Sequence, residues 1–490
     1  MFSTKFFDKK KMTKKSVALW SFAAATIALE VFLLLRRALR KQSGPIPIPW
    51  IGPFLSMLYA NNRQKRHAHL YEKYGAVVSV ESVFYTTHII SDPELIAHVF
   101  KDTVTFRDRT TNSLFAYFTP MGLLSLSTDD MWKRHRSILS QMFTDKYLEH
   151  YVKIMRATAS KLVAKWAASG STSDLGKDLN ALTLDILGSA VLGHDFEMLE
   201  DNENSSNELF DREKSMPYII YLLLISSFPR WIKPFVPVPY YKKRAYAVDR
   251  MMRDLTLSLV KKAKEGNLDP HCLLSILLSV TPAWSEMEIM SELQHFILAG
   301  HETTANTLNF AFHLLSFHPE IQQKAREEIK AVGVGNVSKL QYCWAIFREA
   351  LRLYPTVPNT ARVVAATTTL PGGVTVGKHD IVVLNLVPAS RDPAVYASPD
   401  EFRPSRWLDT LNHAEGFAHV PNFGGGLRRC IGQRFAEEEG IVILAAVLSS
   451  LEIHPGNQTQ EAIETGNAVT LFAKDKIALK MAPILEGIDA

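Results

Sequence analysis

The stretch FGGGLRRCIGQRFA, residues Phe423 to Ala436, surrounds one of only three cysteines with glycine and arginine. Glycine permits backbone conformations and close approaches that other side chains block. The residues from Ile431 to Leu444 have a helical pattern, so Cys430 is expected at or near a helix N-terminus. Helix-end amides and the adjacent Arg428 and Arg429 both favour a thiolate. The stretch therefore predicts an electropositive thiolate that serves as a nucleophile, a redox sensor or a metal ligand.

The composition is that of a globular protein with a large core. The chain has 490 residues, of which 47% are hydrophobic and 10% aromatic. Cys272, Cys343 and Cys430 are far apart, so they support neither a disulfide framework nor a zinc ribbon, and they suit a reducing compartment. A net charge of +5 is small for this length, so no nucleic-acid partner is expected.

The N-terminal region has the features of a membrane anchor. Ser16 to Leu35 is long enough to span a bilayer as a helix, is interrupted only by Glu30, and is followed by no clear cleavage site. A buried core helix is the alternative, and lysines on both sides leave its orientation open. We predict an anchor with its flanks over residues 1–43, a proline-rich connector over 44–53, and a single catalytic domain over 54–490.

The rest of the chain is predicted to be mainly α with a small β portion. Val77 to Ile90 has the composition of two short strands, and helical periodicity then runs from about Asp92 to about Phe317. Short strands follow Arg362, and residues 468–481 are expected to form a last hairpin. Met216 to Phe235 is too short to span a membrane, and it is either a lipid-contacting surface or a buried helix.

One long helix is predicted to hold reactive groups at its middle. Ser285 opens a capping box, and the helix is expected to run to about Phe317. Glycine within a helix costs about 1 kcal/mol relative to alanine, so Gly300 predicts a local break that leaves backbone groups for a ligand. Glu302 and Thr303 follow as an acid and a hydroxyl that could relay protons. The alternative is that Thr303 bonds back to its own helix as a core hydroxyl.

The spacing Phe423-x-x-Gly426-x-Arg428-x-Cys430-x-Gly432 resembles the haem-binding loop of the cytochrome P450 family. The resemblance implies the cytochrome P450 fold and a haem b cofactor whose iron has the Cys430 thiolate as its axial ligand. It also implies that Phe423 packs beside the sulfur and that Arg428 pairs with a haem propionate. The resemblance extends from the proline-rich connector to the last hairpin.

Other segments resemble further motifs of the same family. AGHETT resembles its oxygen-binding groove, and the groove residues are Ala299, Gly300, Glu302 and Thr303. EALR and FRPSRW resemble the Glu–Arg–Arg network that supports the haem site, and its members here are Glu349, Arg352 and Arg406. Two more matches complete a propionate cradle, which consists of Trp132, Arg136 and Arg362.

These resemblances imply a membrane-anchored haem-thiolate monooxygenase that uses O2. No nucleotide-binding fingerprint is present, so electrons are expected from a separate NADPH-cytochrome P450 reductase. The analogy places the protein in the endoplasmic reticulum membrane as a single-pass protein with a cytosolic catalytic domain. Candidate basic contacts for the reductase are Lys133, Arg134, Arg429 and Arg434.

The substrate is expected to be a lipophilic small molecule. The family analogy places pocket-lining positions between Thr110 and Leu124 and at Phe296, Val357, Thr360 and Leu471, most of them apolar. Ordinary core packing is the alternative for each. Two rival functions remain open, a haem-thiolate lyase or isomerase and a non-enzymatic haem sensor, and both are disfavoured by the intact pair Glu302 and Thr303.

Overall fold

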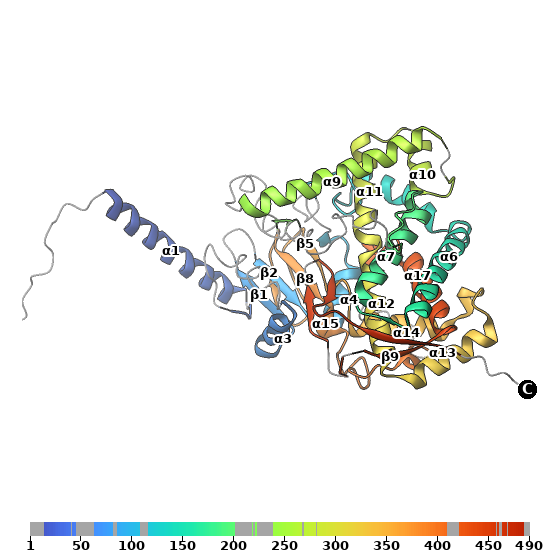
Figure 1. The fold of residues 1–490 in the computed structure, drawn as a ribbon. Helices are drawn as coiled ribbons and strands as arrows, with labels where there is room; N and C mark the ends of the chain where they lie inside the picture. The colour runs from blue at the N-terminus through green and yellow to red at the C-terminus, as the bar shows by residue number, and fades with distance from the viewer. Residues whose placement is uncertain are drawn as a thin grey trace, which may run out of the picture.

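The computed structural model describes residues 14–40, 42–45, 63–81, 86–107, 116–200, 218, 221–222, 239–266, 269–280, 282–408, 421–456, 458–459, 463–467 and 469–484. Helices dominate these residues and strands form a small portion, as the sequence predicts (Figure 1). The proline-rich connector from residue 46 onward lies outside the described residues. So does the Met216 to Phe235 segment, apart from Tyr218, Tyr221 and Leu222.

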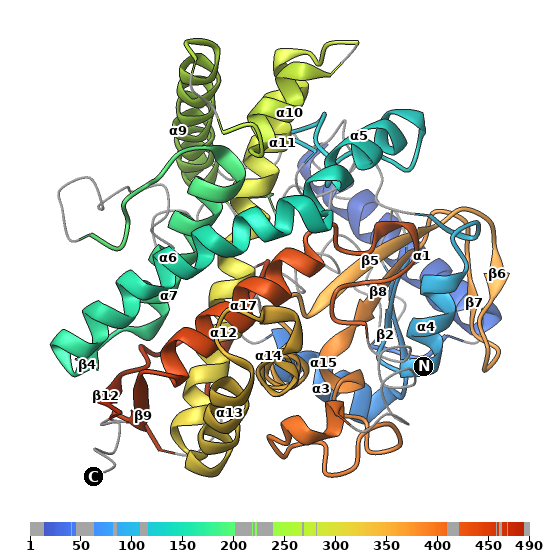
Figure 2. The same cartoon turned by 90° about the vertical axis from the view of Figure 1, so that its right-hand side faces the viewer.

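The core of the helical part is a set of long helices that pack side by side (Figure 2). Helix α12 (Glu302–Ser316) contacts α7 (Leu175–Leu187), α14 (Gln341–Leu353) and α17 (Gln433–Leu448), and α17 also packs on α6 (Asp145–Ser169). Their buried faces join one apolar cluster that runs in sequence from Leu123 to Met481. Burial of these faces is the main source of stability for such helices.

The predicted capping box is present, but the long helix that it opens is interrupted. Helix α11 (Glu286–Gly300) begins with reciprocal hydrogen bonds between Ser285 and Glu288, and α12 starts after His301. The local break predicted at Gly300 is therefore confirmed, and it divides the long helix into α11 and α12. The hydroxyl of Thr183 on α7 donates to the carbonyl oxygen of His301 at 3.1 Å, which stabilises the break.

Gly300 is explained by packing against α7. A Cβ atom at this position would lie 2.7 Å from the Leu187 side chain, closer than van der Waals contact allows. A larger residue would push α11 away from α7. The glycine expected to leave backbone groups open to a ligand therefore also lets two helices approach closely.

A five-stranded sheet lies beside the helices and receives helix α4 (Pro93–Lys101) on one face. Its strand order is β1-β2-β8-β5-β3, with β2 parallel to β8 and the other pairs antiparallel. The strands are β1 (Val77–Glu81), β2 (Thr86–Ile90), β8 (Ile381–Asn385), β5 (Asn359–Val364) and β3 (Phe106–Arg107). The two strands predicted within Val77 to Ile90 are confirmed as β1 and β2.

The end of the chain differs from the predicted hairpin over residues 468–481. Strand β11 (Leu471–Ala473) pairs with β10 (Thr465–Asn467), which precedes it. Strand β12 (Leu479–Pro483) pairs instead with β9 (Leu451–Pro455) and β4 (Ser171–Thr172). That hairpin prediction is wrong because each strand satisfies its backbone groups with a partner from elsewhere in the chain.

The remaining elements connect these layers. Short pieces are η2 (Gln141–Phe143), the π-helical η3 (Gly188–Leu192), η6 (Val337–Lys339), α15 (Leu386–Ala389), η7 (Pro404–Trp407), η8 (Gly426–Arg428) and the pair β6 (Thr368–Thr369) and β7 (Thr375–Val376). Further helices are α3 (Arg63–Tyr74), α5 (Asp130–Ser140), α9 (Pro239–Lys264), α10 (Leu273–Ser279) and α13 (Pro319–Val332).

Helix α1 (Lys14–Leu39) extends away from the rest of the molecule (Figure 1). Just beyond its end, Arg40 Nη1 donates to Asp380 Oδ2 at 2.8 Å and joins it to the sheet region. Within the ranges given above, no helix combines the length and the apolar character needed to cross a membrane. The membrane-spanning segment predicted over Ser16 to Leu35 is therefore not confirmed, although α1 includes these residues and Glu30 lies among them.

Candidate functional site

The loop around Cys430 is closed by its own backbone and by glycine packing. The Cys430 N–H donates to the carbonyl oxygen of Phe423 at 2.8 Å, and Gly424 and Gly426 have φ of +73° and +63°. Between them, a Cβ atom on Gly425 would lie 2.8 Å from the Phe100 side chain of α4. The glycines are therefore needed both for the left-handed turns and for the close contact with α4.

The sulfur of Cys430 lies in front of the N-terminus of α17, whose capping residue is Gly432. Cys430 keeps an exposed surface, but protein atoms crowd around it, and this desolvation raises the pKa of its thiol. The backbone N–H of Gly432 and the charges of Arg136 and Arg429 oppose that effect. The predicted support of the thiolate by helix-end amides and by Arg429 is therefore present, but burial has the larger effect on the pKa of Cys430.

Helix α5 contributes two of the predicted cradle residues. Asp129 caps the helix by accepting from the Trp132 N–H at 2.9 Å, and Arg136 follows one turn later. The Trp132 side chain is buried, and its Nε1 donor has no hydrogen-bond partner. Arg136 is half-buried near Cys430, and desolvation lowers the pKa of its guanidinium. Both residues therefore present donors suited to an anionic group.

Arg428 lies against α5, with its guanidinium carbon 4.4 Å from the centre of the Trp132 ring. It also donates to the carbonyl oxygens of Leu123, at 2.8 Å, and of Leu126. The predicted role in pairing with a propionate is thus joined by a role in fixing the segment that precedes α5. Arg362 on β5 lies over the Phe100 ring at 5.1 Å and donates to the Ala361 carbonyl oxygen at 2.9 Å.

These residues fit a haem with a thiolate ligand. A haem presents an iron that accepts a sulfur ligand and two carboxylates that need donors. Cys430 supplies the sulfur, while the unpartnered Trp132 Nε1 and the half-buried Arg136 supply donors on the same side of the molecule. A buried indole N–H without a partner is costly unless a bound group satisfies it.

Glu349 is the centre of a buried network that includes all three residues predicted for it. Its carboxylate accepts from Arg352 Nη2 and from Arg406 Nε, both at 2.8 Å. It also accepts from the Trp407 indole at 2.9 Å and from the Arg403 N–H at 3.0 Å. Burial would raise the pKa of Glu349, but these donors, Arg352 first, hold it below its usual value.

This network reaches the cysteine loop through Asn422. Arg352 Nη1 donates to the Ser390 carbonyl oxygen at 2.9 Å, and the Ser390 hydroxyl donates to Asn422 at 3.4 Å. Asn422 in turn donates to the Leu351 carbonyl oxygen at 3.2 Å. Sequence reasoning missed Asn422 and Trp407, because an asparagine beside a glycine-rich loop and a tryptophan in a short helix have many ordinary roles.

Arg348 is a further residue that sequence reasoning missed. It is almost fully buried, donates to Glu437 Oε1 of α17 at 3.0 Å, and lies over the Phe423 ring. In the sequence, the only indication of a role for Arg348 is its position directly before Glu349. That indication is weak, because neighbouring residues on a helix point to different sides. Arg348 thus links α14, α17 and the cysteine loop.

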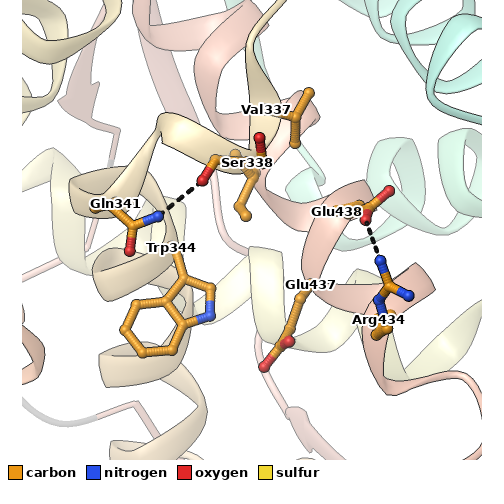
Figure 3. Close-up of a pocket in the computed structure, with 8 residues that line it drawn as sticks. Val337, Ser338, Gln341, Trp344, Arg434, Glu437 and Glu438 are labelled. Carbon is orange, nitrogen blue, oxygen red and sulfur yellow. Dashed lines mark hydrogen bonds and ion pairs between the residues drawn. The ribbon is translucent and has the colours of Figure 1, made fainter. Parts of the chain in front are cut away.

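A hollow between η6, α14 and α17 lies beside this link (Figure 3). Glu437 projects into it from α17, and Trp344 forms its opposite wall on α14. Arg434, one of the predicted basic contacts, also lines it and pairs with Glu438 at 4.0 Å and with Asp145 at the start of α6. The lining of the hollow is both polar and apolar, and the hollow lies beside the first turns of α17, the helix that follows the cysteine loop.

The predicted proton-relay residues lie at the break between α11 and α12. The Thr303 hydroxyl donates to the Ala299 carbonyl oxygen at 2.8 Å, and Ala299 is exposed. This bond crosses the break from α12 to α11 and corresponds to the backbone bond that the sequence left open as the alternative for Thr303. Glu302 is half-buried beside it. Three residues earlier than Ala299, Phe296 stacks on Phe143 with ring centres 6.3 Å apart.

The other predicted pocket residues meet around Thr356. Its hydroxyl lies 3.4 Å from that of Thr307 on α12, and its carbonyl oxygen accepts from the Leu471 N–H at 2.9 Å. Val357 and Thr360 follow in the same segment and are half-buried, whereas Leu471 is buried. Positions 110–115 of the predicted pocket lie outside the described residues.

The fold and the cysteine site define a haem-thiolate protein, and comparison with known proteins assigns its family. The family model for cytochrome P450 matches residues 43–481, so the chain belongs to the cytochrome P450 family. It is a monooxygenase of that family, and its cofactor is haem with the Cys430 thiolate as the axial ligand of the iron.

Similar curated proteins extend over nearly the whole chain. Cytochrome P450 3A11 of Mus musculus is 26% identical over 500 residues, which cover 93% of this chain and 96% of that protein. Cytochrome P450 3A31 of Mesocricetus auratus is 27% identical over 470 residues, with 90% and 91% covered. Cytochrome P450 3A12 of Canis lupus familiaris is 27% identical over 473 residues, with the same coverage.

Proposed function

We propose that this monooxygenase inserts one oxygen atom from O2 into a lipophilic small molecule, with electrons from a separate NADPH-dependent reductase. The observation that carries the proposal is an apolar cluster rich in aromatic residues, against which Leu298 of α11, the residue before Ala299, packs. Its buried members are Phe118, Tyr221, Leu222 and Ala245, with Tyr117, Tyr218 and Leu298 packed against them. Apolar and aromatic side chains with a few hydroxyl groups are typical of sites for small apolar ligands.

The cluster offers stacking surfaces with few polar groups. Phe118 stacks on Tyr218 with ring centres 5.3 Å apart and meets Tyr246 edge-on at 5.3 Å. The hydroxyl groups of Tyr117 and Tyr246 form a hydrogen bond with each other, with their oxygens 2.8 Å apart. An apolar molecule would therefore find aromatic faces here.

Individual residues have distinct roles in the proposed reaction. When bound, the haem supplies O2 activation, and its thiolate ligand favours cleavage of the O–O bond. The Gly432 N–H, Arg136 and Arg429 stabilise negative charge on the Cys430 sulfur. Thr303 holds a proton at Oγ1. Glu302, the half-buried first residue of α12, replaces that proton after it is transferred.

The supporting roles of other residues are part of the same proposal. Trp132, Arg136, Arg362 and Arg428 would hold the propionates, Phe423 would pack beside the sulfur, and Glu349, Arg352 and Arg406 would keep the loop in place. Phe296, Val357, Thr360 and Leu471 would line the substrate pocket. A single domain over residues 54–490 is supported by the apolar cluster that joins Leu123 to Met481.

Docking of the reductase is proposed on the side of the cysteine loop. Lys133 is well exposed, and within the described part of the chain it pairs with the exposed Asp130 at 3.0 Å. Arg134, Arg429 and Arg434 already have partners within the chain at Pro282, Gln433 and Asp145 respectively. Lys133 is thus the basic residue most available to an acidic protein, and Lys133→Glu should slow electron transfer at low salt.

Attachment to the endoplasmic reticulum membrane through α1, with the catalytic domain in the cytosol, is also proposed. Its support is that Ile27, Val31, Phe32, Leu34 and Leu35 of α1 are exposed apolar side chains. Fractionation of cells that express the full chain, followed by carbonate extraction, tests this. Retention in the pellet would indicate a span, release would indicate surface attachment, and absence from membranes would contradict the proposal.

The decisive test of the proposed reaction uses the purified protein beside Cys430→Ser. The reduced protein with CO should show the strongly red-shifted Soret band of thiolate ligation, and the variant should lose it. Reconstitution with a reductase should then give substrate-dependent consumption of NADPH and O2. A thiolate spectrum with conversion of substrate but no consumption of O2 would indicate a lyase or isomerase, and a thiolate spectrum without any turnover would indicate a sensor.

A further inference from the structure

A cluster of two histidines and an aspartate lies apart from the cysteine site. His150 is on α6, while Asp269 and His271 precede α10. His150 Nε2 lies 2.7 Å from Asp269 Oδ2, and His271 Nδ1 lies 3.1 Å from Asp269 Oδ1. The two imidazole rings stack with centres 4.5 Å apart and planes at 21°. Three potential ligands from two separate segments therefore converge on one point.

We propose that His150, Asp269 and His271 bind a divalent transition-metal ion of the zinc class. Among the residues that the structure describes, these three form a group whose ligand atoms all lie within 4.8 Å of one another. Tetrahedral Zn²⁺ with nitrogen and oxygen ligands at about 2.0–2.2 Å places those ligands about 3.4 Å apart. Small side-chain rotations would bring the ligand atoms, now within 4.8 Å of one another, to that spacing.

The donor set selects the type of metal. Imidazole nitrogen suits zinc, copper and nickel, whereas calcium and magnesium prefer a shell made of oxygen alone. Each of the three side chains is about one-third exposed, with values of 30%, 31% and 27% for His150, Asp269 and His271. A water molecule can therefore complete the coordination, and the ion can enter from solvent.

The backbone around the ligands is held in place by other bonds. The hydroxyl of Tyr151, the residue after His150, donates to the His271 carbonyl oxygen at 2.7 Å. The Ser275 hydroxyl of α10 donates to the Asp269 carbonyl oxygen at 2.7 Å, and the His271 N–H donates to Asp269 Oδ1 at 2.8 Å. Because the segments are fixed relative to each other without the ion, binding needs little reordering.

The ion would join α6 to the start of α10. Helix α6 also pairs with α17 through Asp145 and Arg434, and α17 directly follows the cysteine loop. A metal at His150 would therefore stabilise the helical support of the cysteine site without contacting it. The simpler reading is that Asp269 only accepts hydrogen bonds from two imidazoles, and this reading predicts no metal affinity.

Equilibrium dialysis of the full, haem-loaded chain against ZnCl₂, without a histidine tag, tests the proposal. We expect one Zn²⁺ per chain, with affinity at least about tenfold weaker in His150→Ala and in His271→Ala. Asp269→Asn keeps an oxygen that accepts from the His271 N–H, so it should fold and still bind zinc more weakly. His454→Ala is the matched control, since His454 is half-exposed beside Glu452 at 3.6 Å and should leave binding unchanged.

Two further readouts separate a ligand role from a merely structural one. Zn²⁺ should raise the thermal midpoint of the wild-type protein but not of His271→Ala. X-ray absorption at the zinc edge should show only nitrogen and oxygen at about 2.0–2.1 Å. The proposal is overturned if the wild-type chain binds no zinc, if the histidine variants bind like His454→Ala, or if sulfur coordinates the ion.

Discussion

The guanidinium carbon of Arg348 lies 5.4 Å from the centre of the Phe423 ring, at the start of the cysteine loop. The same group lies 5.4 Å from the Trp407 ring and pairs with Glu437 at 3.0 Å. Burial lowers the pKa of Arg348 to about 10, so it remains charged at neutral pH. A buried cation thus joins the Glu349 helix to the loop that holds the haem ligand.

Replacement of Arg348 by alanine should destabilise the protein and weaken haem binding. Removal of one partner of a buried ion pair typically costs about 3–5 kcal/mol. The cost here should lie at the lower end, because Glu437 is partly exposed in the hollow and also accepts from Gln433 Nε2. Urea unfolding and the fraction of protein with the red-shifted CO band measure the two effects. Lys133→Ala, which breaks only an exposed pair, should change stability by less than about 1 kcal/mol. Equal effects of the two variants would contradict the role given to Arg348.

The Glu349 network should make stability depend on acidity. The pKa of Glu349 is lowered in the folded state. The ionised carboxylate therefore stabilises the fold at pH values above 4.5, the ordinary pKa of glutamate. This contribution is lost as pH falls through the lowered folded value. Glu349→Gln should therefore cost about 3–5 kcal/mol at pH 7 and progressively less below pH 4.5. Unfolding free energies at several pH values measure this, and a cost that stays constant would count against the ionised network.

Trp132→Phe should speed loss of haem while the protein stays folded. The change removes only the Nε1 donor and keeps an aromatic ring beneath Arg428. A hydrogen bond to a charged group contributes about 1.5–3 kcal/mol, so release should become about tenfold faster or more. Transfer of haem to an apo-globin scavenger measures the rate. An unchanged rate would mean that the indole does not bond a propionate.

Thr303→Ala should separate NADPH consumption from product formation. Loss of the hydroxyl at the helix break removes the proposed proton donor, and positioned proton transfer contributes about 10²–10⁴-fold. Product formed per NADPH should fall by at least about tenfold, while the CO spectrum stays unchanged. Thr303→Ser keeps the hydroxyl and should keep the ratio near that of the wild type. Normal coupling in the alanine variant would remove Thr303 from the mechanism.

Local sequence patterns predicted the parts of the molecule that depend on neighbouring residues. The capping box at Ser285, the strands β1 and β2, and the helix that follows Cys430 all formed as expected. The resemblance also predicted that Glu349, Arg352 and Arg406 form one network. In the structure both arginines donate hydrogen bonds to Glu349. Their function in holding the haem site stays a prediction.

Features that depend on distant partners could not be predicted. Gly300 indicated a break in the long helix, but not that the break is stabilised by Thr183, which lies 118 positions from His301. The final strand pairs with β9 and β4 because those edges are available in the folded chain, and no local pattern shows this. Arg348 and Trp407 acquire their roles from burial against Glu437 and Glu349, so their residue types alone gave no indication.

The contact of Gly425 and Gly426 with Phe100 has a consequence for the order of assembly. Helix α4 is made early in synthesis, whereas the loop that packs on it emerges only after more than 400 residues. The cysteine cannot reach its place until the C-terminal part of the chain has returned to this early segment. Cofactor capture at Cys430 is therefore expected only after the loop has been synthesised and has docked on α4.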